Sequence, residues 1–210
     1  MSRMQTATAE QERILASPWG GGRSPFGTDW GKLMMWLFII SDALTFAALI
    51  ATYGIMRYIS PRWPIHEYPI FDMKLIGFMT FALISSSAVM AMAVGAAREH
   101  NPKLAVRFLL LTILGGVIFL GSQAYEWAHF IGEGARLWGN PWGVPQFSAS
   151  FFVMTGFHGF HVFSGVVYLT VVALRAALGR YTDQGVEIAG LYWHFIDIVW
   201  VFIFAFFYLL

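Results

Sequence analysis

The chain has 210 residues, of which 58% are hydrophobic and only 12% are charged. A soluble domain carries about 25% charged residues, so this composition excludes an ordinary soluble domain and indicates an all-α polytopic membrane protein. The net charge of +1 gives no sign of a nucleic-acid partner, and the lack of cysteine excludes disulfides, iron–sulfur clusters and thiolate copper sites.

The chain begins with a polar tail, residues 1–32, which contains the Gly/Pro-rich stretch PWGGGRSPFG. The rest, residues 33–210, is expected to form a transmembrane bundle. A helix needs about 20 residues to cross a bilayer, and five apolar segments reach that length. They are placed at 33–56, 74–97, 104–130, 149–175 and 189–210.

The segments between these predicted helices are typical of loops outside the bilayer. Residues 57–73 contain three prolines, which exclude a continuous helix there. The stretch REHNPK (98–103) predicts a tight turn. The stretch WGNPWGVPQ (138–146) holds tryptophans, which are frequent at membrane interfaces.

The basic residues predict how the bundle lies in the membrane. Nine of the thirteen lysines and arginines fall on the side of the N-terminal tail and four on the opposite side. Cytoplasmic loops carry the excess of positive charge, so we expect the N-terminus in the cytoplasm and the C-terminus outside. The nine are Arg3, Arg13, Arg23, Lys32, Arg98, Lys103, Arg107, Arg175 and Arg180, and the four are Arg57, Arg62, Lys74 and Arg136.

Small residues recur at a spacing of four in the first two predicted helices. Such ridges let membrane helices approach closely, so they predict helix–helix seams, within this chain or with a partner. The alternative is that alanine is simply common in membrane helices. The two ridges are Ala43, Ala47 and Ala51, and Ser87, Ala91 and Gly95. The serines at 85–87 can bond backbone carbonyls one turn back and need no ligand.

Titratable side chains lie inside several predicted helices, where each is costly unless it is paired or faces other protein. Six of them form pairs at a spacing of three, which puts both members on one helix face. Glu-x-x-His is also a pattern of metal sites in helical bundles. The pairs are Glu126 with His129, His158 with His161, and His194 with Asp197.

The depths of these groups argue against a single metal or haem site. At about 1.5 Å per residue, His194 lies about 8 Å inside one end of its helix, and Glu126 lies within about 6 Å of the opposite face. Two histidines alone are too few ligands for a closed site. We therefore interpret the pairs as hydrogen-bonded contacts between helices and predict no catalytic residue, metal or redox cofactor in this chain. A self-contained metalloenzyme is the less favoured alternative.

Asp42 lies inside the first predicted helix with no charged partner one turn away. An intramembrane carboxyl is a functional candidate by default, so we expect it to exchange protons or line a polar cavity. The structural alternative is a hydrogen bond to a carbonyl or serine of another helix. A transporter with Asp42 as proton relay is a further alternative, although the sequence lacks the interrupted helices and repeats of many transporters.

Four motifs in chain order resemble subunit III of the haem–copper respiratory oxidases. They are FIISDALTFAALIATY (38–53), GSQAYEW (121–127), TGFHGFHVFSG (155–165) and YWHFIDIVWVFIF (192–204). The resemblance covers residues 30–210 and is to the five-helix bacterial form. Where this family often carries a buried glutamate the chain has Asp42, which resembles the variant in quinol-oxidising members. Glu187 falls where the family also has a glutamate.

The resemblance implies an accessory subunit, not an enzyme by itself, of a proton-translocating terminal oxidase in a bacterial plasma membrane. Such a subunit packs beside subunit I, which holds the haems and copper. It stabilises subunit I, binds phospholipid and supports proton uptake, the role expected of Asp42. Polar interhelical or lipid-headgroup contacts are expected of Glu126, His129, His158, His161, Glu187, His194 and Asp197.

The resemblance leaves the electron donor open. The motif QAYEW and the general pattern resemble members that oxidise cytochrome c, which is the donor we favour. Asp42 points instead to a quinol oxidase, the main alternative. The related subunit associated with nitric oxide reductases shares these helices and is the second alternative.

Overall fold

The computed structural model describes residues 28–64, 70–180 and 183–210. The Gly/Pro-rich stretch of the tail, with Arg3, Arg13 and Arg23, lies outside these described residues. Within them, five helices are long and apolar enough to cross a membrane. They are α2 (Trp30–Ile59), α4 (Met73–Arg98), α5 (Pro102–Gly132), α6 (Pro145–Ala177) and α7 (Asp183–Ile203), which continues as the π-helical segment η1 (Phe204–Leu209). The predicted all-α fold with five spans is confirmed.

The helices extend beyond their predicted apolar segments, and the largest difference is at α7, which begins at Asp183 instead of residue 189. Helices continue past the hydrocarbon until a cap or a proline ends them. Pro102 and Pro145 begin α5 and α6, where the missing backbone N–H of proline carries no penalty. The Asn101 side chain accepts a hydrogen bond from the Leu104 N–H at 3.2 Å and caps α5.

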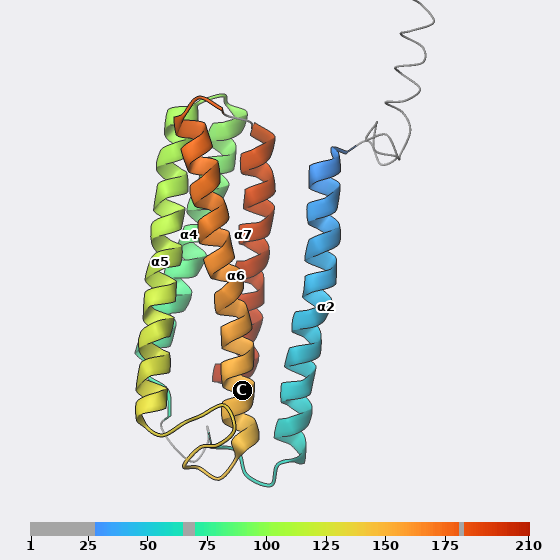
Figure 1. Ribbon diagram of the computed structural model, residues 1–210, viewed down its shortest axis with the longest axis vertical. Coiled ribbons are helices and arrows are strands. Elements are labelled where there is room, and N and C mark those ends of the chain that lie inside the picture. Colours follow the sequence, from blue (N-terminus) through green and yellow to red (C-terminus); the bar gives the residue numbers. More distant parts are fainter. Residues whose placement is uncertain (1–27, 65–69, 181–182) are drawn as a thin grey trace, which may run out of the picture. The chain divides into compact units, whose positions relative to one another are not determined.

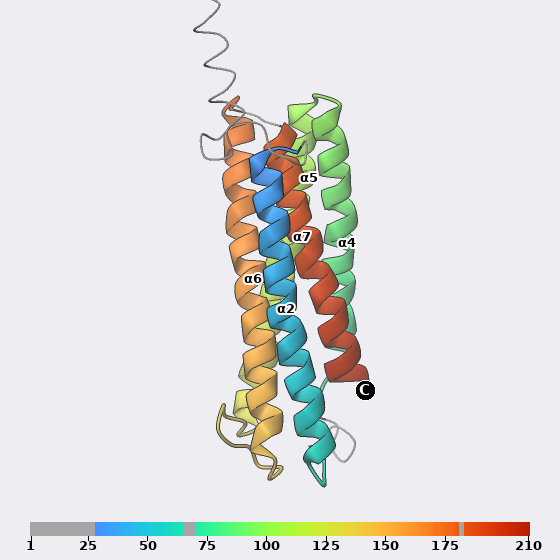
Figure 2. The same ribbon diagram turned by 90° about the vertical axis from the view of Figure 1, so that its right-hand side faces the viewer.

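The chain falls into two parts, Met1–Ser41 and Asp42–Leu210, with the division inside α2. In the first part, the Ser41 hydroxyl donates to the Phe38 carbonyl at 2.8 Å within α2. The second part holds the remainder of α2 and the other helices. There, successive helices run in alternating directions, and α4, α5, α6 and α7 lie side by side (Figures 1 and 2). The predicted boundary at residue 33 stays a prediction.

Helix α7 supplies the centre of the core through Trp193, which is fully buried. Its indole lies against two glycines of neighbouring helices. A Cβ on Gly116 of α5 would come within 2.5 Å of the indole, and a Cβ on Gly165 of α6 within 3.0 Å. The indole N–H donates to the Ser86 hydroxyl of α4 at 3.1 Å. One side chain thus fixes the mutual approach of α4, α5, α6 and α7.

A second tryptophan of α7 repeats the contact with α4. The Trp200 indole N–H donates to the Thr80 hydroxyl at 3.0 Å. Near the start of α7, the Gly190 backbone lies so close to α4 that a Cβ there would meet Val94 at 2.9 Å. These contacts hold α4 and α7 together along most of their length.

Most residues of the two predicted ridges of small residues are exposed, and only Ser87 contacts another helix of the described chain. Ala43, Ala47 and Ala51 of α2 are exposed. On α4, Ala91 is exposed, and a Cβ on Gly95 would meet nothing within 4 Å. The ridge on α2 therefore forms no seam with the described helices, and seams of either ridge with a partner stay a prediction.

Candidate functional site

Asp42 and His161 face each other across α2 and α6. The Asp42 Oδ2 atom lies 3.3 Å from Nε2 of His161, and both side chains are about nine-tenths buried. The two atoms approach without the alignment of a full hydrogen bond. Asp42 has no partner on its own helix, but it has one on α6. The sequence could not show this contact, because it joins two helices.

The other nitrogen of the His161 ring defines how a proton can move at this contact. Nδ1 lies 2.8 Å from the Phe157 carbonyl oxygen and donates to it, because a carbonyl can only accept. Nε2 and the Asp42 carboxyl then face each other, and one further proton can lie between them. With that proton, the pair is either imidazolium with carboxylate or neutral imidazole with carboxylic acid. The geometry can therefore store one proton near the middle of α6.

His158 and His161, which the spacing of three places on one helix face, lie in different surroundings. Its ring stacks on Trp200, with centroids 5.1 Å apart, and meets the edge of Phe119 at 5.5 Å. The side chain is fully buried, and neither ring nitrogen has a hydrogen-bond partner among the described residues. Aromatic rings enclose this imidazole, and the polar contact expected of His158 stays a prediction.

Glu126 and His129 also lie in different surroundings. Glu126 is buried in the bundle, whereas His129 is exposed. The Tyr208 hydroxyl donates to the Glu126 carboxylate at 3.2 Å, whereas His129 lies 3.4 Å from Glu133 on the exposed surface of α5. Glu126 and His129 both line one pocket of about 210 Å³ together with Asp72 and Tyr125. Tyr208 is a partner that the sequence did not reveal, since it lies beyond the last motif.

His194 and Asp197 lie along the seam between α7 and α4. The Ser87 hydroxyl is 2.7 Å from Nδ1 of His194, which is a polar contact between two helices. Ser86 instead donates to the Leu83 carbonyl of its own helix at 2.7 Å. The Asp197 carboxylate is buried and has no hydrogen bond within the described part of the chain.

His194 lies further from the first residue of its helix than predicted, because α7 begins earlier. It is eleven residues after Asp183, which at about 1.5 Å per residue is about 16 Å along the helix. Only about 10 Å of this length separates His194 from Glu187, which forms a partly exposed ion pair with Arg98.

Glu187 makes an ion pair where α4 ends and α7 begins. The Arg98 guanidinium donates to its carboxylate at 2.7 Å, and His100 lies 2.9 Å from Asp183 beside it. These pairs are partly exposed, and such pairs contribute at most about 1 kcal/mol each. They fix the register of α4 and α7 at one end of the bundle.

The GSQAYEW and TGFHGFH motifs meet in a contact between α5 and α6. The Gln123 amide donates to the Thr155 carbonyl at 2.6 Å, and the Trp127 indole donates to the Thr155 hydroxyl at 3.0 Å. A Cβ on Gly159 would lie 2.7 Å from Gln123. The sequence signal for this contact was present, as glycine in one motif and polar residues in the other, but the pairing was missed.

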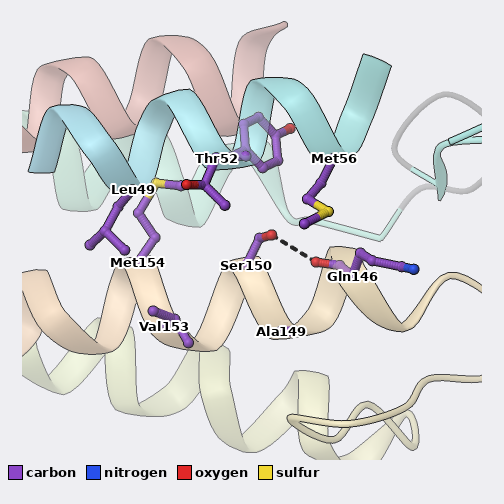
Figure 3. A pocket seen from close by; sticks show the side chains of 9 residues that line it. Leu49, Thr52, Met56, Gln146, Ala149, Ser150, Val153 and Met154 are labelled. Carbon is purple, nitrogen blue, oxygen red and sulfur yellow. Dashed lines mark hydrogen bonds between the residues drawn. The ribbon is translucent and has the colours of Figure 1, made fainter. Parts of the chain in front are cut away.

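A mostly apolar pocket of about 230 Å³ lies between the later part of α2 and the start of α6. Figure 3 shows Leu49, Met56, Val153 and Met154 at this pocket and the bond of the Ser150 hydroxyl to Gln146. The acceptor of that bond is the Gln146 carbonyl at 2.7 Å. The Ser150 hydroxyl is thus satisfied by its own helix, and the pocket offers mainly an apolar surface.

These polar groups lie at different depths and on different seams. No three histidine or carboxylate side chains in residues 28–64, 70–180 and 183–210 come together as a group that could hold a metal ion. What the arrangement can do is join helices in pairs, hold one proton between Asp42 and His161, and accept an apolar ligand beside α2.

Comparison with known proteins adds a family to this geometry. Residues 17–210 match the family model described as cytochrome c oxidase subunit III. A protein named "Probable quinol oxidase subunit 3" from Staphylococcus aureus (strain USA300) is 35% identical over 177 residues, which cover 83% of this chain and 86% of that protein. A protein of the same name from Staphylococcus saprophyticus is 33% identical over the same share of each chain.

Proposed function

Because this chain belongs to the cytochrome c oxidase subunit III family, we propose that it is an accessory subunit, without redox centres, of a proton-translocating haem–copper terminal oxidase. It is a multi-pass protein of the bacterial plasma membrane and part of an oxidase complex. Oxygen reduction to water takes place in the partner subunits, with subunit I, which holds the haems and copper, as the main contact. The chain stabilises that subunit during turnover.

The observation that carries this proposal is the family match over nearly the whole chain. The contacts of the buried polar groups support it, because most of them join two helices in pairs. A bundle joined in this way is suited to support a neighbouring subunit.

Two features support the finer parts of the proposal. The contact of Asp42 with His161 at 3.3 Å is suited to support proton uptake into subunit I. The apolar pocket between α2 and α6 is suited to a phospholipid acyl chain. The basic residues at the end where α4 and α6 finish favour a cytoplasmic N-terminus; in the described part they include Arg98, Arg175 and Arg180.

The electron donor has two candidates. The sequence motifs favour cytochrome c, whereas the Staphylococcus relatives carry the name quinol oxidase and Asp42 resembles quinol-oxidising members. The relatives shift our proposal towards quinol. Oxygen consumption by the purified complex, with a quinol or with reduced cytochrome c as donor, decides between the two.

The main test is purification of the tagged chain from its native membrane in a mild detergent. We expect haem-bearing subunits to copurify in a fixed ratio, and the chain separated from them to show no haem spectrum and no stoichiometric copper. Oxygen reduction by the separated chain would overturn the proposal. The absence of every haem-bearing subunit from the purified sample would also contradict the proposal.

A second test addresses Asp42. We expect the Asp42→Ala complex to assemble and to lose activity faster during turnover, because the proton-holding contact is gone. Wild-type turnover and wild-type inactivation kinetics in this variant would rule out a role of Asp42 in proton uptake.

A further inference from the structure

His194 has one ring nitrogen that the described chain leaves without a partner. Nδ1 bonds the Ser87 hydroxyl at 2.7 Å, and the side chain is half-buried. Nε2 makes no hydrogen bond within residues 28–64, 70–180 and 183–210, and it is not among the enclosed polar atoms, unlike both nitrogens of His158. Nε2 therefore reaches the surface of the bundle.

The surface around this nitrogen is apolar and exposed. Ile84 and Ala91 lie one turn before and one turn after Ser87 on the same face of α4, and both are exposed. Ile198 lies one turn after His194 on α7 and is 57% exposed. These residues and the polar pair at their centre form a surface that we call the Ser87/His194 face.

Depth decides what can cover this face. His194 lies seven residues after Glu187, whose ion pair with Arg98 is partly exposed, and fifteen residues before Leu209. It therefore lies about 10 Å inside the charged pair at one end and about 22 Å from the other end of the span. Lipid headgroups lie at the ends of a span, and acyl chains offer no hydrogen bond. An accessible ring nitrogen at this depth is costly unless protein supplies its partner.

We propose that the Ser87/His194 face docks a transmembrane helix of another oxidase subunit, and that this helix presents a hydrogen-bonding side chain to Nε2 of His194. The inference rests on the proposed function, because it requires the chain to be part of an oxidase complex. It also gives the small residues of α4 a role. Ala91 is exposed and Gly95 has open space around its Cα, so a foreign helix can approach closely there.

The contact with Ser87 narrows the chemistry of the partner side chain. If Ser87 donates to Nδ1, Nε2 carries the ring proton and needs an acceptor; if Nδ1 donates to Ser87, Nε2 needs a donor. A hydroxyl or an amide can serve in either case. A carboxylate or an ammonium group serves in only one and would bring a charge into the hydrocarbon. The partner helix is therefore expected to present serine, threonine, asparagine or glutamine at this depth.

Photocrosslinking in the intact complex tests which surface is covered. A photoreactive benzoylphenylalanine replaces Ile198 or Ala91 on the face, or Leu114 or Val117 as controls, which are exposed on α5. After illumination of native membranes, we expect crosslinks from the first two positions to another oxidase subunit and from the control positions to lipid alone. Crosslinks from Ile198 and Ala91 only to lipid, or to a second copy of this chain, would overturn the inference.

Substitution of His194 tests the hydrogen bond itself. We expect His194→Leu to reduce severalfold the amount of other subunits that copurify with the tagged chain, and His194→Gln, which can still donate and accept, to retain most of it. The amount of each variant in the membrane and its melting temperature control for folding. Equal copurification of His194→Leu and wild type would contradict the inference.

The two experiments keep this inference separate from the proposed function. If no oxidase subunit copurifies with the wild-type chain, the proposed function fails. If subunits copurify but the crosslinks arise only from other faces, the proposed function stands and the docking of a helix on the Ser87/His194 face fails. Where His194→Leu does not accumulate, the crosslinks in the otherwise unchanged chain decide.

Discussion

Two contacts in the second part of the chain are built in opposite ways. Around Trp193, the backbones at Gly116 and Gly165 approach the indole so closely that a methyl group has no room. Between α2 and α6, Asp42 faces His161 at 3.3 Å. The rings of Phe46 and Phe157 also meet there, with centroids 5.0 Å apart. Further along that seam, a pocket of about 230 Å³ separates the helices.

The difference teaches what makes a tight seam in this bundle. Helices in a membrane associate through close fit, since lipid is as apolar as the side chains. The tight seam arises where a large ring faces missing side chains, and not where small residues form a row. The row Ala43, Ala47 and Ala51 stays exposed in the described part of the chain.

The sharpest way to break the tight seam is Gly116→Val. Its Cβ alone would come within 2.5 Å of the Trp193 ring and within 2.8 Å of Val166. Overpacking of this kind costs about 1–3 kcal/mol or more, so we expect little assembled complex and a clearly lower melting temperature. Gly121→Val on the same helix is the control, because nothing lies within 4 Å of a Cβ there. Similar losses for both variants would show that valine harms α5 regardless of Trp193.

Loss of Asp42 from the looser seam between α2 and α6 should lower stability less than Gly116→Val does. Asp42→Ala leaves Nε2 of His161 without its partner, and an unsatisfied buried group costs about 1–3 kcal/mol. We expect a value at the low end, because the contact at 3.3 Å lacks full alignment, and Asp42→Asn should retain most of the stability. Melting of the single variants and of the double variant with His161→Ala gives the coupling. Strictly additive losses would show that the two side chains do not interact.

Trp200→Phe should have a smaller effect than either. It keeps an aromatic ring against His158 but removes the bond to the Thr80 hydroxyl, which is 3.0 Å long. A neutral hydrogen bond contributes about 1 kcal/mol, and we expect a loss of that size. The double variant with Thr80→Val should lose less than the sum of the two, because neither polar partner is then left alone. Melting curves of the three variants test this, and additive losses would exclude the bond.

Ala149→Leu should have the smallest effect. Ala149 lines the pocket between α2 and α6, where extra methyl groups meet open space. Changes away from packed sites stay within about 0.5 kcal/mol, so we expect a wild-type melting temperature and less lipid bound to the purified chain, measured by mass spectrometry. A large drop in stability would mean that this seam is as tightly packed as the one at Trp193.

The sequence predicted the parts of the fold that depend on local patterns. Apolar length defined the five spans, and the prolines, as at Pro102 and Pro145, lie where helices begin. The predicted helix ends were less accurate than the predicted spans, because the helices continue as polar turns beyond the hydrocarbon. This is why α7 begins at Asp183 instead of residue 189.

The partners of the polar residues could not be predicted, because they lie on other helices. The sequence named no partner on another helix for these groups, whereas the structure places His161 beside Asp42 and Glu126 beside Tyr208. A spacing of three reports only that two side chains share a helix face. What they meet depends on how the helices are rotated, which the packing of large side chains decides.

Glycine within the spans was the signal that remained unused. Glycine weakens a helix interior, so its presence at Gly116 and Gly165 points to a backbone that something approaches closely. The residue type that fills such a site is not readable from the glycine itself. Trp193, fully buried in the last motif, was the side chain to match with it.

The place of Trp193 in the chain has a consequence for biogenesis. Gly116 and Gly165 lie on α5 and α6, which are synthesised before α7, so the notch that receives the indole is made by helices already in the membrane. Once α7 is synthesised, Trp193 packs between these helices and joins them. A nascent chain halted before residue 183 would expose that notch to the proteases that survey incomplete membrane proteins, and arrival of the tryptophan would end this vulnerability.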